Sequence, residues 1–140
     1  MQNQITRFQL DWHNCGLCFY KDIVQEQIVI DREANTLDIK EINGGQEVCS
    51  CKTLKILPNQ AEKFFQFIED VVQKLATHYE VDVCDGSTWI LTLTDSEART
   101  QEIRGTIYYP PYGKDIEKLI LDFIHGSKET ITPRMFGCSC

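Results

Sequence analysis

Apolar side chains recur at every second position in six stretches of this chain, and at helical spacing in two others. Alternation puts successive side chains on opposite faces of a strand, whereas a spacing of three or four residues gathers them on one side of a helix. The helical stretches cover 60–79 and 113–125. The strand-like stretches cover 4–12, 27–32, 36–42, 47–56, 88–94 and 100–108.

The order of these stretches constrains the fold further. Four strands precede the first helix, and two more precede the second, with turn signals at Glu33-Ala-Asn35 and Asp85-Gly86. Runs of strands followed by a helix suit hairpins, whereas a doubly wound parallel sheet alternates strand and helix throughout. We therefore predict an α+β fold: a mainly antiparallel sheet of about six strands, with two amphipathic helices packed on one face.

Polar residues indicate where the helices begin and end. Asn59 is a good N-cap, and Glu62 follows three residues later as in a capping box. His78 and His125 fall at the predicted C-termini, where a cationic ring complements the helix dipole. Glu69-Asp70 falls on the side of the first helix that we expect to face water.

Length and patterning predict a single domain over 1–126 followed by a C-terminal tail over 127–140, because the tail lacks a clear period. The first residues do not have the pattern of a signal peptide. No apolar run approaches the about 18 residues that cross a membrane. We therefore expect a cytoplasmic protein without membrane partners.

The chain carries 21 acidic and 14 basic residues, a net charge of −7. Lys and Arg are scattered, whereas binding to a phosphate backbone needs them clustered. The composition therefore disfavours nucleic acid as a partner. An acidic surface can meet a basic protein, although it also simply favours solubility.

Seven cysteines include three close pairs: Cys15/Cys18, Cys49/Cys51 and Cys138/Cys140. Cys15 and Cys18 have the gap that lets two thiolates reach one zinc ion. Cys49 and Cys51 could complete four ligands, although Cys-x-Cys is a less usual partner, and the alternatives are His13, Cys84 or the pair Cys138/Cys140. A thioredoxin-like site is a poorer fit, because no helical pattern follows Cys18. Buried structural cysteine is the simplest interpretation for most of the seven. We expect no cofactor, with zinc as the alternative.

Tyr108, Tyr109 and Tyr112 flank two prolines before the second predicted helix. Tyrosine in a loop is typical of binding surfaces. The same rings could instead pack the end of the sheet onto the helix. They are our candidate binding surface from sequence.

The segment from Cys84 reads Cys-Asp-Gly-Ser-Thr-Trp-Ile-Leu, with Gly105, Tyr109-Pro110 and Leu119 downstream. It resembles a loose group of uncharacterised bacterial α+β proteins with an Asp-Gly-x-x-Trp hairpin and a Tyr-Pro before a closing helix. The resemblance implies a core tryptophan, a strand glycine and a helix start. It implies no activity.

No stretch pairs a nucleophile with a base, and no phosphate loop or zinc-protease motif occurs. We therefore expect a non-enzymatic binding or interaction module that meets a protein partner or a second copy of itself, such as an inhibitor or immunity-type protein. The alternative is a zinc-stabilised or thiol-dependent protein centred on Cys15 and Cys18.

Overall fold

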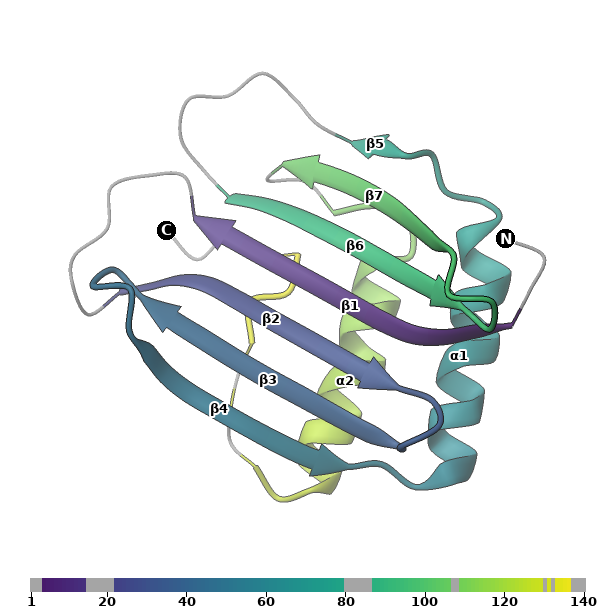
Figure 1. The fold of residues 1–140 in the computed structure, drawn as a ribbon, viewed down its shortest axis with the longest axis horizontal. Helices are drawn as coiled ribbons and strands as arrows, with labels where there is room; N and C mark the ends of the chain where they lie inside the picture. Colours follow the sequence, from purple (N-terminus) through teal and green to yellow (C-terminus); the bar gives the residue numbers. More distant parts are fainter. Residues whose placement is uncertain are drawn as a thin grey trace.

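The computed structural model of the chain describes residues 4–14, 22–79, 87–106, 109–129, 131 and 133–136. Within these residues it forms a seven-stranded sheet with the strand order β4-β3-β2-β1-β6-β7-β5. Neighbouring strands are antiparallel, except that β5 runs parallel to β7 (Figure 1). The strands are β1 (Ile5–Asn14), β2 (Ile23–Asp31), β3 (Thr36–Asn43), β4 (Val48–Lys55), β5 (His78–Tyr79), β6 (Ser87–Asp95) and β7 (Thr100–Thr106).

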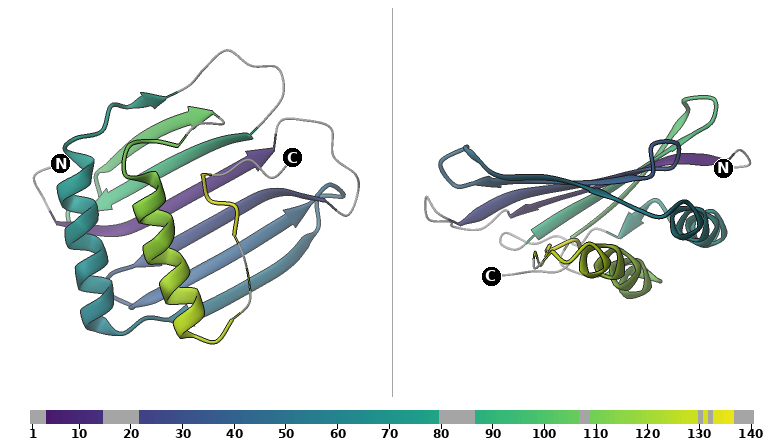
Figure 2. Two further views of the ribbon diagram at one scale, coloured as in Figure 1. Left: turned by 180° about the vertical axis from the view of Figure 1, so that it is seen from behind. Right: turned by 90° about the horizontal axis from the view of Figure 1, so that it is seen from below.

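The described helices are α1 (Pro58–Val72) and α2 (Gly113–Gly126). Both lie against the same face of the sheet, so the molecule has two layers (Figure 2). The predicted α+β class and mainly antiparallel sheet are confirmed. Neither described helix is both long and apolar enough to span a membrane.

The core lies between these layers and follows the alternation of the strands. In β1, Phe8 and Leu10 face the helices and pair in register with Ile30 and Ile28 of β2, all buried. From α1, the ring of Phe64 meets Phe8 edge to face, with 5.1 Å between ring centroids. Such aromatic pairs add to the free energy gained by burying their area. The centre of the core is therefore a contact between one strand and one helix.

Gly105 of β7 lies directly opposite Trp89 of β6. Trp89 is fully buried, and a Cβ atom at position 105 would collide with its indole ring. Glycine is required here because the ring passes across the backbone of the neighbouring strand. The core tryptophan and strand glycine expected from the sequence therefore form one packing unit.

The first helix ends at Val72 and not at 79 as predicted. Backbone amides of Lys74 and Leu75 turn back to Val71 and Val72 oxygens, and the chain leaves the helix. His78–Tyr79 then pairs with β7 as strand β5, so His78 is not at a helix C-terminus. Tyr79 stacks on Trp89 with 6.2 Å between centroids. Tertiary pairing thus overrides the helical spacing of the sequence.

The predicted capping box is also wrong. The N-cap of α1 is Leu57, Pro58 occupies the first turn, and no side chain caps the helix. Proline is favoured there because its missing N–H has no partner in the helix to lose. His125 does lie in the last turn of α2, as predicted.

The described part of segment 127–136 packs on the core. Met135 and Phe136 are buried, and the ring of Phe136 meets Trp89 edge to face at 5.0 Å between centroids. The boundary between the domain and the C-terminal tail at residue 126 stays a prediction. Met135 and Phe136 nevertheless belong to the same hydrophobic core as buried residues between 5 and 124.

Candidate functional site

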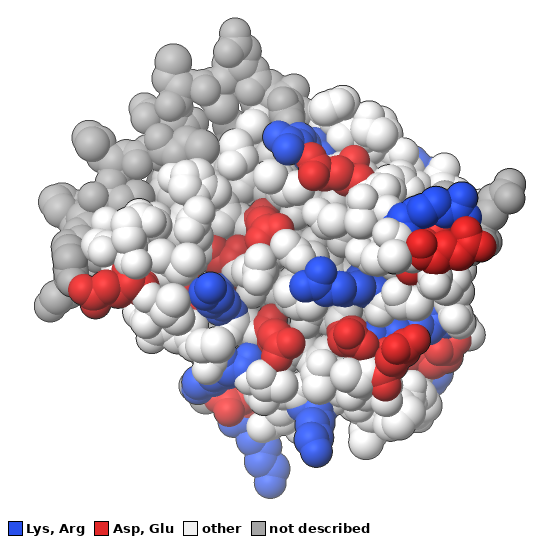
Figure 3. All heavy atoms as spheres, in the orientation of Figure 1, with Lys and Arg blue, Asp and Glu red and all other residues white. Residues whose placement is uncertain are grey.

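The sheet face away from α1 and α2 is called the open face here. It is formed by the residues of β1 and its neighbours that alternate with the core positions. Arg7, Gln9, Asp11 and His13 of β1 lie on it. Figure 3 views the molecule from this side and shows acidic and basic side chains scattered among uncharged ones. The open face is therefore polar without a region of one dominant sign.

A hollow of about 500 Å³ lies on the open face, across the end of the sheet where β1 finishes and β2 begins. Four strands contribute to it, so it is a property of the folded sheet and not of any one segment. It is called the open-face hollow, and its lining includes Asp11, His13, Gln25, Gln27, Lys40, Ile42, Thr88 and Ile90.

Asp11 is the fixed charge of this hollow. Its Oδ2 accepts a hydrogen bond from Gln9 Nε2 at 2.8 Å, and its Oδ1 accepts one from Gln27 Nε2 at 2.9 Å. Among the described residues no Lys, Arg or His forms an ion pair with Asp11. Two neutral amides thus hold the carboxylate in place and leave its charge uncompensated by an ion pair.

The rest of the hollow combines hydrogen-bonding groups with apolar surface. Lys40 lies beside Gln27 in the register of β2 and β3, and His13 lies between β2 and β6. Ile42 and Ile90 are half-buried and contribute the apolar part. Such a mixture is typical of surfaces that bind other proteins, where apolar contacts are surrounded by polar groups.

Sequence reasoning missed this hollow, although a signal for it was present. Gln9, Asp11 and His13 alternate with the buried Phe8 and Leu10. That alternation assigns the polar residues to one face of the sheet. It does not say which strand becomes the neighbour of β1, and so it cannot bring Gln27 or Thr88 to the same place.

Glu26 is a charged residue at a position where the alternation of β2 otherwise places apolar side chains. It faces the helix layer and is only 2 % exposed. Its Oε1 accepts hydrogen bonds from the backbone amides of Arg134 at 2.8 Å and Met135 at 3.0 Å. Burial, with a smaller effect of the neighbouring Glu41, raises the pKa of Glu26 to about 7, although these hydrogen bonds oppose the rise. The carboxyl group of Glu26 thus holds residues 134 and 135 against the helix side of the sheet.

A second carboxylate extends this anchor. Glu117 of α2 accepts a hydrogen bond from the amide of Phe136 at 3.2 Å, and burial raises the pKa of Glu117. The guanidinium of Arg134 lies 5.4 Å from the ring centroid of Trp12 and 3.4 Å from Glu41. Together, Glu26, Glu117 and the amides of 134–136 form what is called the C-terminal anchor.

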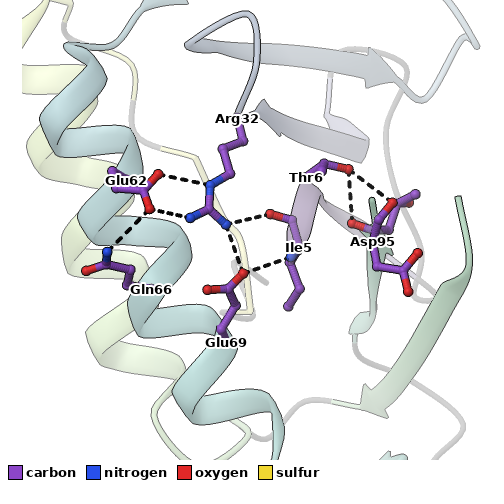
Figure 4. A network of polar contacts seen from close by, with 8 residues as sticks. Ile5, Thr6, Arg32, Glu62, Gln66, Glu69 and Asp95 are labelled. Carbon is purple, nitrogen blue, oxygen red and sulfur yellow. Dashed lines mark hydrogen bonds and ion pairs between the residues drawn. The ribbon is translucent and has the colours of Figure 1, made fainter. Parts of the chain in front are cut away.

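Arg32 joins the first helix to the sheet (Figure 4). Its Nη1 lies 2.8 Å from Glu69 Oε2 and 2.9 Å from the carbonyl oxygen of Ile5, and its Nε donates to Glu62 at 3.1 Å. The hydrogen bond with Arg32 lowers the pKa of Glu62. Glu69 was predicted to be merely solvated, but it also accepts the amide of Ile5. This network is structural, because the guanidinium of Arg32 is bound by two carboxylates of α1 and by a backbone carbonyl of β1.

The tyrosines predicted to form a binding surface precede α2, in the helix layer and not on the open face. Tyr108 lies outside the described residues, while Tyr109 and Tyr112 are 38 % and 41 % exposed. Burial and a hydrogen bond to Glu117 raise the pKa of Tyr109 to about 12. Its ring lies 6.1 Å from Phe136. Tyr109 thus packs toward the core and the C-terminal anchor, and binding at this loop stays a prediction.

The zinc prediction cannot be assembled from the described residues. Cys15 and Cys18 fall outside them, whereas Cys49 and Cys51 are exposed free thiols on β4. Over the described ranges, no group of three or more His, Cys, Asp or Glu is placed to hold a metal ion. Convergence of the four cysteines on zinc therefore stays a prediction.

Comparison with known proteins gives no match to a family model and no match to a curated protein.

Proposed function

We propose that this chain is a non-enzymatic binding module that engages a protein partner through the open face. The observation that carries the proposal is the open-face hollow, in which a fixed carboxylate lies beside half-buried isoleucines. An inhibitor or immunity-type protein would act in this way, by covering a surface that its partner needs.

The charge of Asp11 supports a partner that presents a basic side chain. A carboxylate already held by Gln9 and Gln27 loses little freedom when an Arg or Lys binds to it, so less of the binding free energy is lost to ordering. The net charge of −7 would also speed the approach of a basic protein.

The hollow is open to solvent along the sheet, which favours a protein over a small molecule as its ligand. Small-molecule sites are mostly apolar and enclose most of their ligand. Here polar side chains such as Gln25 and Lys40 line a depression in an exposed sheet. A protrusion of a partner protein could enter it while the surrounding sheet contributes further contact.

The test uses proteins captured by the purified chain from its own cells, followed by titration calorimetry with each purified candidate. Ile90→Arg should abolish binding by filling the hollow, and Asp11→Asn should weaken it about tenfold through the lost charge pair. Asp122→Asn makes the same chemical change on α2, in the opposite layer, and should bind as the wild type does.

Binding that survives both open-face substitutions but is lost in a Tyr109→Ala/Tyr112→Ala variant would move the site to the tyrosine loop. Turnover of a substrate by the purified chain, lost on substitution in the hollow, would contradict the non-enzymatic assignment.

A further inference from the structure

Residues 133–136 are called the strap here, because they cross the helix side of the sheet and belong to no described helix or strand. Figure 2 shows them in yellow beside α2, on the face of the sheet that both helices cover. Met135 and Phe136 are buried, and the ring of Phe136 lies against Trp89 at 5.0 Å between centroids. A segment outside the helices and the strand ladders can open while those elements stay intact.

Side-chain carboxylates hold the backbone of the strap. The amides of Arg134 and Met135 donate to Glu26 of β2 at 2.8 and 3.0 Å, and the amide of Phe136 donates to Glu117 of α2 at 3.2 Å. In the strand ladders, by contrast, amides donate to uncharged backbone carbonyls. A carboxylate gains or loses a proton, and its cost of burial changes with its charge. The attachment of the strap is therefore sensitive to pH where the strand ladders are not.

The groups that face Glu26 come from both neighbouring strands and from the strap. Trp12 of β1 and Glu41 of β3 lie opposite it in register, one uncharged and the other a like charge. Arg134 of the strap supplies a positive charge, and its Nη1 lies 3.4 Å from Glu41. On α2, Glu117 adds a further carboxylate at the other end of the strap. The positive charge that compensates Glu41 is thus carried by the strap itself.

Two sets of forces act on the proton of Glu26. Burial and the charge of Glu41 favour the neutral acid, whereas the amides of Met135 and Arg134 and the charge of Arg134 favour the carboxylate. The first set prevails, and the pKa of Glu26 is raised to about 7. When the strap detaches, water reaches Glu26 and the pKa returns toward its ordinary value of 4.5. Attachment is therefore strongest below about pH 4.5 and is weakened as the pH rises through about 7.

We propose that the strap is a pH-dependent closure, which covers Trp89 while Glu26 is protonated and detaches from the sheet as Glu26 ionises. Detachment withdraws Phe136 and uncovers apolar surface on the helix side, while the strands and helices stay folded. Glu117 acts in the same direction, because burial raises its pKa as well, although the amide of Phe136 and the charge of Lys114 oppose the rise.

The closure is separate from the open-face function. Asp11 and its amide partners lie on the other face of the sheet and keep their contacts when the strap detaches. Failure of one proposal therefore leaves the other standing.

Amide hydrogen exchange between pH 4.5 and 8 measures the release directly, with each rate normalised to the intrinsic rate of that residue at that pH. The protection factor of Met135 should fall about a hundredfold over this range, because release lowers the pKa of Glu26 from about 7 toward 4.5. Leu10, in a strand paired on both sides, should be protected at least about tenfold more at every pH. Equal protection would show that the strap opens only with global unfolding, and protection of Met135 that holds or rises with pH would refute the closure.

Glu26→Gln identifies the titrating group. The variant keeps an Oε1 acceptor for both amides but has no proton to lose, so the protection of Met135 should lose most of its pH dependence. Glu33→Gln, in the exposed turn between β2 and β3, should behave as the wild type does. An unchanged pH dependence in Glu26→Gln would overturn the assignment to Glu26. Should this variant not fold, the comparison of Met135 with Leu10 in the wild type still decides whether the strap opens locally.

Trypsin gives a second measurement of the same opening. It cleaves after Arg134, and the amide of that bond is the Met135 amide that donates to Glu26 while the strap is attached. Cleavage there, identified by mass spectrometry, follows the population of the open form. Between pH 6 and 8 its rate in the wild type, relative to Glu26→Gln at the same pH, should rise about tenfold. A constant ratio would refute the pH-dependent closure.

Discussion

On the helix side of the sheet, nearly every residue is buried against its neighbours; on the open side, the alternate residues of the same strands are mostly half-buried or exposed. Phe8 and Phe64 interlock on the first side, and even its polar groups, such as Arg32 and Glu26, have their partners within the fold. Asp11 on the second side is held only by amides.

This difference indicates that stability and partner binding depend on alternate residues of the same strands. Residues on the helix side determine stability, because their burial and contacts exist only in the folded chain. Residues on the open side are less buried, so we expect most substitutions there to cost little stability.

Replacing Phe64 by Ala should give the largest loss of stability. Its ring meets Phe8, Phe65 and Phe123 edge to face, and removing it leaves a cavity at the centre of the core. We expect the free energy of unfolding to fall by about 4 kcal/mol, measured by urea denaturation. Thr92→Ala, on the open face of β6, is the comparison and should cost far less; equal losses would contradict the separation of the faces.

Glu26 should make stability depend on pH. Its pKa is about 7 in the fold against an ordinary value of 4.5, so the protonated form is favoured by folding. The stabilisation is complete below about pH 4.5 and is lost as the pH rises through about 7. With 1.36 kcal/mol per pKa unit, the loss amounts to about 3 kcal/mol.

Glu26→Gln should remove this dependence while its Oε1 keeps the two amide contacts of the C-terminal anchor. Unfolding free energies measured from pH 4.5 to 8 should therefore diverge between this variant and the wild type, with the variant relatively more stable at high pH. Glu33→Gln, in the exposed turn between β2 and β3, is the matched substitution. Parallel curves for the wild type and Glu26→Gln would show that Glu26 does not titrate in this range.

Alternation was enough to predict where the six longer strands lie and many of their buried residues, because a period of two is a local property. It failed where a distant contact decides the structure. The residues at 73–79 keep a helical spacing, yet Tyr79 packs on Trp89 from a short strand that pairs with β7. No local pattern contains that information.

The candidate site shows the same limit. The polar identity of Asp11 and His13 was visible, but the hollow needs Gln27 and Lys40 from other strands to lie beside them. The unusual position of Glu26 had a signal in the sequence, since this charged residue alternates with Val24 and Ile28 on the buried face of β2. Its partners come from residues more than a hundred positions away, and only the folded chain supplies them.

Gly105→Ala tests whether the helix side tolerates even one added carbon. The Cβ atom would collide with the buried indole of Trp89, which has no free space to enter. We expect a loss of about 2 kcal/mol in the free energy of unfolding, as for other overpacked cores. Gly126→Ala is the matched control, because its Cβ would meet no atom within 4 Å and should cost little. Similar losses in both variants would point to backbone effects instead.

The smallest effect on stability is expected from Ile90→Arg, on the open face. Ile90 is half-buried, and the long stem of Arg can lie along the sheet while its charge reaches water. The free energy of unfolding should fall by about 1 kcal/mol or less, no more than a typical point substitution costs. Thermal unfolding monitored by circular dichroism measures it. A loss as large as that of Phe64→Ala would mean that the open face is part of the core's support, and binding defects at this position could then no longer be assigned to the hollow.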